Sequence, residues 1–102
     1  MKTHEEYMEL ALEEARKAEE IDEVPVGCII VCDGEVISRG HNLKEQLNQA
    51  YAHAEMMAIQ KAAEVKGNWC LNDCDLYVTL EPCMMCTGII NLSRIRTVYY
   101  GT

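Results

Sequence analysis

Residues 27–32, Gly-Cys-Ile-Ile-Val-Cys, form an apolar stretch without polar alternation. A strand with one solvated face alternates apolar and polar side chains, whereas a strand covered on both faces is apolar throughout. We therefore predict an interior strand over residues 27–32. Both faces of such a strand must be buried by other elements, and this requirement narrows the possible folds more than any other feature of the chain.

Turn and helix signals divide the rest of the chain into alternating elements. Asp33-Gly34 is a two-residue hairpin signal that predicts an antiparallel strand over residues 35–40. Thr3-x-x-Glu6 is a capping box that starts a helix ending near Glu20. The later patterns predict a loop over residues 41–51, a helix over 52–66, a strand over 75–79, a helix from Pro82 to about Leu92 and a strand over 97–101. This order predicts an α/β fold with a mixed sheet sandwiched by helices.

Length and composition place the chain among ordinary globular proteins. Its 102 residues fit one domain, residues 1–102, with a single core. No apolar run reaches the roughly 18 residues of a membrane span, and the first residues lack the apolar core of a signal peptide, so we expect a cytoplasmic protein without a membrane partner. Six cysteines in such a chain favour free thiols or metal ligands over a disulfide framework.

The net charge of −8 argues against nucleic-acid binding, because phosphate contacts are made by Lys and Arg. The charge is unevenly distributed, however. Residues 2–23 hold nine of the 17 acidic side chains but three of the nine basic ones. This acidity is typical of one solvated helix face, and it does not decide which kind of partner the protein has.

Two short motifs, His53-Ala54-Glu55 and Pro82-Cys83-Met84-Met85-Cys86, carry the chemistry, and each stands at the start of a predicted helix. Two thiolates and one imidazole form a tetrahedral zinc site with one open position. The amides at the helix N-terminus favour the thiolate form of both cysteines. Glu55 is poorly placed as a second ligand beside His53 and is better placed at the open position, where it can move protons. The motifs thus predict zinc bound by His53, Cys83 and Cys86, with Glu55 as proton shuttle.

Two other interpretations of these residues compete with a catalytic zinc site. A Cys-x-x-Cys pair alone could be a redox pair. A closed structural zinc site would need a fourth ligand, and the candidates for it are Cys28, Cys32, Cys70, Cys74 and His41. Cys28 and Cys32 are roughly 13 Å apart along their strand and are better explained as core residues. We interpret Cys70 and Cys74 as loop thiols, and Met56, Met57, Met84 and Met85 as core residues.

With these motifs, the chain resembles the bacterial tRNA adenosine deaminases, within the cytidine deaminase-like superfamily. The similarity extends from about Tyr7 to Gly101. The zinc motif is typical of the superfamily, and the flanking segments favour the adenosine branch. The segments that carry the resemblance are Pro25-Val26-Gly27, Gly40-His41-Asn42, residues 52–56, residues 77–88, Ser93-Arg94-Ile95 and residues 98–101.

The resemblance implies a three-layer α-β-α fold and hydrolytic conversion of adenosine to inosine at the wobble position of a tRNA anticodon, with Zn²⁺ as cofactor. It also implies a homodimer and the tRNA anticodon loop as partner. Residue by residue, it implies zinc ligation by His53, Cys83 and Cys86 and proton transfer by Glu55. Substrate contacts are implied for Asn42, for the Ala54 backbone and for Val26, which would line the base pocket. An alternative role for Asn42 is to cap its own loop.

The chain departs from this family in one large respect. Family members continue past the position of Gly101 with another strand and with C-terminal helices rich in basic and aromatic residues. We expect this chain, which stops at Thr102, to lack them and to grip tRNA less firmly. A deaminase of a small free base or nucleoside, of the guanine or cytosine type, and a non-catalytic zinc-stabilised module remain alternatives. The acidic charge fits the small neutral base better.

Overall fold

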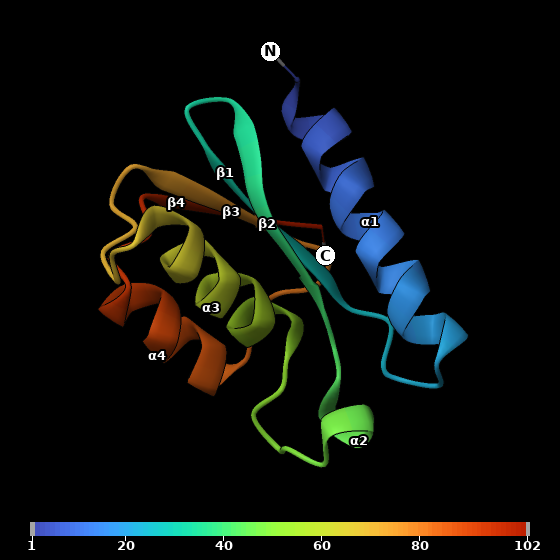
Figure 1. The fold of residues 1–102 in the computed structure, drawn as a ribbon. Helices are drawn as coiled ribbons and strands as arrows, with labels where there is room; N and C mark the ends of the chain where they lie inside the picture. The colour runs from blue at the N-terminus through green and yellow to red at the C-terminus, as the bar shows by residue number, and fades with distance from the viewer. Residues whose placement is uncertain (1, 102) are drawn as a thin grey trace.

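The computed structural model describes residues 2–101 and contains one four-stranded sheet covered by helices on both faces (Figure 1). The strand order is β2-β1-β3-β4, with β1 antiparallel to both neighbours and β4 parallel to β3. The strands are β1 (Gly27–Cys32), β2 (Glu35–His41), β3 (Cys74–Val78) and β4 (Thr97–Tyr100). The helices are α1 (His4–Glu20), α2 (Lys44–Leu47), α3 (Ala54–Lys66) and α4 (Met84–Leu92). The predicted mixed sheet and three-layer α/β fold are confirmed.

The side chains of β1 divide between two hydrophobic clusters, one on each face of the sheet. Ile29 and Val31 pack with residues of α1, whereas Cys28, Ile30 and Cys32 pack with residues of α3 and α4. All six residues of β1 are buried. The apolar stretch at residues 27–32 is therefore the interior strand that its composition predicts.

Local signals in the sequence account for most element boundaries. Thr3 caps α1 with the predicted capping box, in which its hydroxyl accepts from the Glu6 amide. Asp33 and Gly34 adopt φ angles of 52° and 80°, as a tight hairpin turn between β1 and β2 requires. Gly67 ends α3 in the left-handed conformation. In residues 2–101, no helix is long and apolar enough to span a membrane.

Two acidic residues of the first segment are buried, so the expectation of a uniformly solvated acidic face is wrong for them. Glu14 accepts hydrogen bonds from Lys17 Nζ at 2.7 Å and His41 Nδ1 at 3.0 Å. Burial raises the pKa of this carboxyl, but the two hydrogen bonds outweigh it and leave the pKa below its ordinary value. Glu23 accepts from the amides of Glu45 and Gln46. The Glu14–His41 contact links α1 to β2, and the Glu23 contacts link the segment after α1 to α2.

Three further expectations need correction. Residues 41–51 contain the short helix α2, whose amides are capped from a distance by Glu23, a contact that local sequence cannot reveal. Cys74 is no loop thiol, because it begins β3 and is fully buried opposite Cys32. Met84 and Met85 are 92% and 40% exposed, so neither is the core residue that we predicted.

Gly40 on β2 allows α3 to approach the sheet closely. A Cβ at this position would lie 2.6 Å from the Ala54 carbonyl oxygen and 2.7 Å from the Ala58 amide nitrogen, both of them backbone atoms. Gly40 therefore sets the distance between the N-terminal turn of α3 and the sheet. That distance also determines where the adjoining His53 and Glu55 lie.

We expect Gly40→Ala to lower the free energy of unfolding by about 1–3 kcal/mol, because helix backbone must shift to admit the methyl group. Gly88→Ala is the matched control, since a Cβ there meets no atom within 4 Å. That control should be neutral or stabilising by about 0.5–1 kcal/mol, because Ala favours helix over Gly. Urea denaturation of both variants measures the effect, and equal stability of the two would contradict the close-packing argument.

Candidate zinc centre and substrate pocket

The two chemical motifs meet where the N-terminal ends of α3 and α4 lie side by side. His53 is the N-cap of α3 and Cys83 is the N-cap of α4, both in extended backbone conformations that aim their side chains out of the helix. Cys86 lies one turn into α4 and is fully buried. Both helices begin two residues later than predicted, α3 at Ala54 and α4 at Met84, so His53 and Cys83 immediately precede them.

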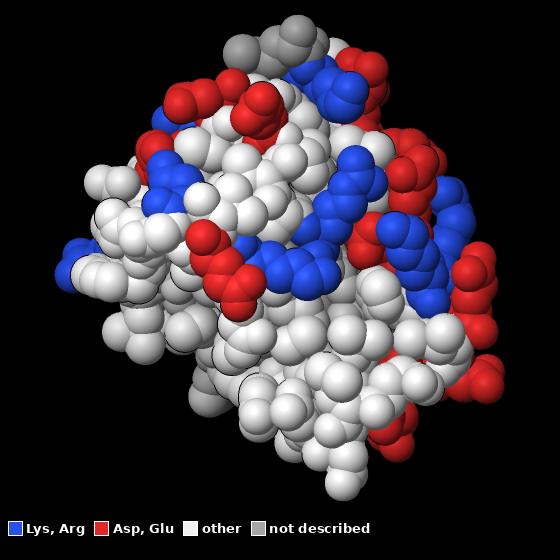
Figure 2. Space-filling model, in the orientation of Figure 1, with Lys and Arg blue, Asp and Glu red and all other residues white. Residues whose placement is uncertain are grey.

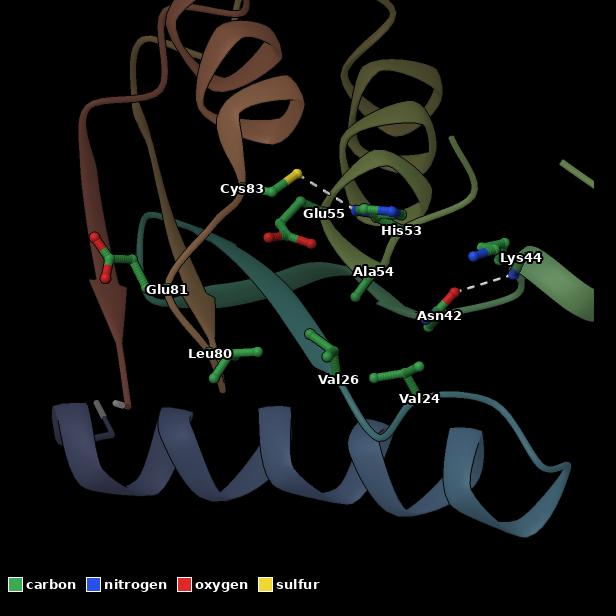
Figure 3. A pocket seen from close by; sticks show the side chains of 10 residues that line it. All are labelled: Val24, Val26, Asn42, Lys44, His53, Ala54, Glu55, Leu80, Glu81 and Cys83. Atoms are coloured by element: carbon green, nitrogen blue, oxygen red, sulfur yellow. Dashed lines mark hydrogen bonds between the residues drawn. The ribbon is translucent and has the colours of Figure 1, made fainter. Parts of the chain in front are cut away.

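The donor atoms form a triangle of the size that a zinc ion needs. His53 Nδ1 lies 3.6 Å from Cys83 Sγ and 3.6 Å from Cys86 Sγ (Figure 3 shows the first of these contacts). Tetrahedral zinc, with Zn–S near 2.3 Å and Zn–N near 2.0–2.1 Å, separates such atoms by about 3.5–3.6 Å. All three donor atoms lie within 4.8 Å of one another. The residues present therefore fit a zinc ion.

Within residues 2–101, no fourth His, Cys, Asp or Glu ligand atom joins this group. The group therefore leaves one position open to a ligand from outside the protein, as catalytic zinc sites do. This geometry disfavours the closed structural site that Cys28, Cys32, Cys70, Cys74 or His41 would have completed.

A bound cation would ease the ionisation of the buried Cys86 thiol. Burial, followed by the nearby Glu55 and Cys83, raises the pKa of the Cys86 thiol well above its ordinary value. The expectation that helix amides favour the thiolate is outweighed here by desolvation. A cation among the donors would offset that cost, since metal-bound thiols are deprotonated.

Glu55 lies on the first turn of α3 beside the donor triangle, and its side chain points into a cavity (Figure 3). The residue is 4% exposed, and burial raises the pKa of its carboxyl. A carboxylate with a raised pKa takes up a proton more readily, as a group that both accepts and donates protons must.

A cavity of about 230 Å³ joins these residues to the three predicted substrate contacts. It is smaller than the roughly 300–1,000 Å³ of sites for drug-sized ligands, so it suits a single small ring system. Residues Val24, Val26, Asn42, Lys44, His53, Ala54, Glu55, Leu80, Glu81 and Cys83 line it. The structure thus brings Val26, Asn42 and Ala54 to the same cavity as His53, Glu55 and Cys83.

Asn42 also has the loop-capping role that we weighed as an alternative. Its Oδ1 accepts from the Lys44 amide at 3.0 Å (Figure 3), and the residue is 7% exposed. Within the described residues, no protein acceptor is bonded to its Nδ2 group. The capping bond therefore orients the side chain while leaving its amide donor for a ligand.

Four lining residues were not identified from sequence. Val24 and Lys44 flank the predicted contacts Val26 and Asn42, and Leu80 and Glu81 immediately precede the zinc motif. Val24 precedes β1, Lys44 follows β2, and Leu80 and Glu81 follow β3, so all four lie near the strand ends that adjoin the zinc centre. That proximity to the motifs is the signal by which they could have been found.

The fold and the donor triangle together define a zinc-binding domain of the deaminase type. The chain belongs to the cytidine and deoxycytidylate deaminase zinc-binding family, whose sequence model matches residues 1–102. This confirms the resemblance noted above.

Individual relatives are similar over most of the chain. A tRNA-specific adenosine deaminase of Streptococcus pyogenes is 56% identical over 95 residues, which cover 93% of this chain and 60% of the relative. The tRNA-specific adenosine deaminase of Bacillus subtilis is 50% identical over 95 residues, which cover 93% of this chain and 59% of the relative. The chain therefore spans about 60% of the length of these relatives.

Solved structures of two kinds of deaminase show the same fold. A structure from a study of A-to-I editing by tRNA:A34 deaminases matches with a TM-score of 0.92 and 52% identity, covering 94% of this chain and 74% of that one. A guanine deaminase of Bacillus subtilis matches with a TM-score of 0.94 and 39% identity, covering 97% and 64%.

Proposed function

We propose that this chain carries the catalytic centre of a zinc-dependent hydrolase that deaminates adenosine to inosine at the tRNA wobble position. The observation that carries the proposal is the donor triangle of His53, Cys83 and Cys86 opening onto the same small cavity as Glu55 and Asn42. The names of the relatives above, tRNA-specific adenosine deaminases at 50–56% identity, supply the substrate. The cytoplasm would be its location.

In this proposal His53, Cys83 and Cys86 are the zinc ligands. Bound zinc supplies Lewis-acid chemistry, which activates water for attack near neutral pH. Glu55 accepts a proton from the attacking water and delivers protons to a ring nitrogen and to the departing amine, so that water enters at the carbon and ammonia leaves. Asn42 Nδ2 and the Ala54 backbone hold the base, and Val26 packs against it.

Guanine deamination is the second candidate, and the charge of the chain favours it. A guanine deaminase shares the fold at 39% identity, and the net charge of −8 offers little to phosphates. Figure 2 shows that the lower part of the face in view is largely uncharged, with acidic side chains along its right side. A small neutral base needs no cationic clamp.

One assay distinguishes the candidates. The zinc-loaded chain is incubated with an anticodon stem-loop carrying adenosine at the wobble position and, separately, with free adenosine, guanine and cytidine. Inosine in the stem-loop supports the first proposal, whereas ammonia from guanine alone supports the second. A zinc-loaded chain inactive on all four would favour the non-catalytic module.

We also propose a homodimer that associates through α4. This helix, Met-Met-Cys-Thr-Gly-Ile-Ile-Asn-Leu, has no charged side chain, and Met84 and Leu92 are 92% and 70% exposed. Exposed apolar faces of this kind mark protein–protein contacts.

Light scattering at micromolar concentration should therefore give a dimer mass, and Leu92→Glu should shift it toward the monomer by placing a charge in the contact. Leu47→Glu, on the exposed surface of α2, is the control and should leave the dimer intact. A monomer mass for the unmodified chain would refute the association.

A further inference from the structure

A second cluster of metal-ligating side chains lies at the end of the sheet away from the zinc centre. Cys32, the last residue of β1, pairs directly with Cys74, the first residue of β3. The zinc centre adjoins the opposite ends of these strands, near Gly27 and Val78. Cys32, Asp73 and Cys74 place their ligand atoms within 4.8 Å of one another.

The Asp73 carboxylate bridges the two sulfurs. The Cys32 thiol donates to Oδ2 at 3.3 Å, and the Cys74 thiol donates to Oδ1 at 3.4 Å. Two sulfurs and a carboxylate oxygen around tetrahedral zinc are separated by about 3.5–3.6 Å on each S···O edge. The two observed distances run to different oxygens of Asp73 and are slightly shorter than these edges, but the three ligand atoms all lie within 4.8 Å of one another, so the cluster has the size of a zinc site.

A cation already sits against this cluster. Lys66, the last residue of α3, donates to Asp73 Oδ2, and its Nζ lies 3.6 Å from Cys32 Sγ. The hydrogen bonds from Lys66 and then Cys32 hold the pKa of Asp73 well below its ordinary value. The ammonium thus contacts two of the three donor side chains that a metal ion would bind.

We propose that Cys32, Cys74 and Asp73 form a second binding site for a soft divalent cation such as zinc or cadmium, with Lys66 as the cation that the metal displaces. As the two metal–sulfur bonds form, the two thiol protons pass to solvent, and Lys66 swings out with its proton retained. The half-exposed Asp73 side chain provides the path of entry.

Two properties of the cluster set its affinity. Burial raises the pKa of the Cys74 thiol to about 12, so a metal must first displace a tightly held proton. Lys66 must also leave Asp73. The first site carries the same deprotonation cost at Cys86, so the displacement of Lys66 is the cost that makes the second site weaker, and removal of the lysine should strengthen it.

The test is a zinc titration of the full chain against a chromophoric chelator, under a phosphine reductant that keeps all thiols reduced. The unmodified chain should bind a second equivalent of zinc, and Cys32→Ser, Cys74→Ser and Asp73→Asn should bind only the first. Cys70→Ser is the matched control, because this thiol lies outside the cluster, and it should bind both equivalents. Lys66→Met should bind the second equivalent about tenfold more tightly, because no ion pair with Asp73 must then be broken.

His53→Ala separates this site from the catalytic centre. That variant should lose the first equivalent and keep the second, and His53→Ala combined with Asp73→Asn should bind none. Cadmium bound to His53→Ala should show sulfur-to-cadmium charge-transfer absorption in the ultraviolet, and the absorption should disappear in the double variant.

Asp73→Asn and Lys66→Met alter partly exposed side chains, so they remain informative if the buried cysteine variants fail to fold. The proposal is overturned if the unmodified chain binds no second equivalent, or if Lys66→Met binds it no more tightly. It is also overturned if Cys32 and Cys74 are found joined as a disulfide in protein purified under reductant.

Discussion

Glu55→Gln should lower the rate of deamination by about 10²–10⁴-fold, the usual contribution of a positioned general acid–base. Gln keeps the size and hydrogen-bonding capacity of the side chain, so the pocket around Ala54 and Asn42 should persist. It cannot carry a proton between water and the leaving amine. Single-turnover rates on the preferred substrate measure the effect.

Zinc content is the necessary control for this variant. Glu55 is not among the three residues of the donor triangle, so Glu55→Gln should retain about one zinc per chain at the first site. Loss of that zinc along with activity would show that Glu55 is a ligand, and would refute the shuttle role.

Replacing any of His53, Cys83 and Cys86 by Ala should abolish zinc binding at the first site, deamination, and the stability that zinc confers. A ligand that binds only the folded state at a thousand times its dissociation constant stabilises it by about 4 kcal/mol. Thermal unfolding with and without a chelator, together with metal analysis, measures the contribution.

The two cysteines allow metal loss to be separated from lost packing. Cys83 is exposed, so in the presence of chelator Cys83→Ala should unfold at the same temperature as the unmodified chain. Cys86 is fully buried, so Cys86→Ala also leaves a small cavity. This variant should therefore be less stable than the unmodified chain even when chelator has removed the metal from both. Equal unfolding temperatures for the zinc-loaded chain and Cys83→Ala would mean that zinc contributes no stability.

The elements and the donor set of the site followed from local patterns in the sequence. The apolar run at residues 27–32, the Asp33-Gly34 turn and the Thr3 capping box each specify structure through neighbours in the chain. His53, Cys83 and Cys86 could be recognised together because their residue types and helix-start positions match what zinc chemistry requires. The backbone dihedral preferences and the ligand chemistry at each position are determined by residues only a few positions away in the sequence.

Other features depend on contacts between residues far apart in the chain, and only the tertiary structure decided them. Glu23 caps α2 from about 20 residues away, Gly40 admits the backbone of α3, and Cys32 meets Cys74 through strand register. The capping bond of Asn42 is local, but its place beside Glu55 depends on how β2 and α3 pack. Spacing along the chain cannot specify such contacts, because they form only when the sheet assembles and the helices settle on its two faces.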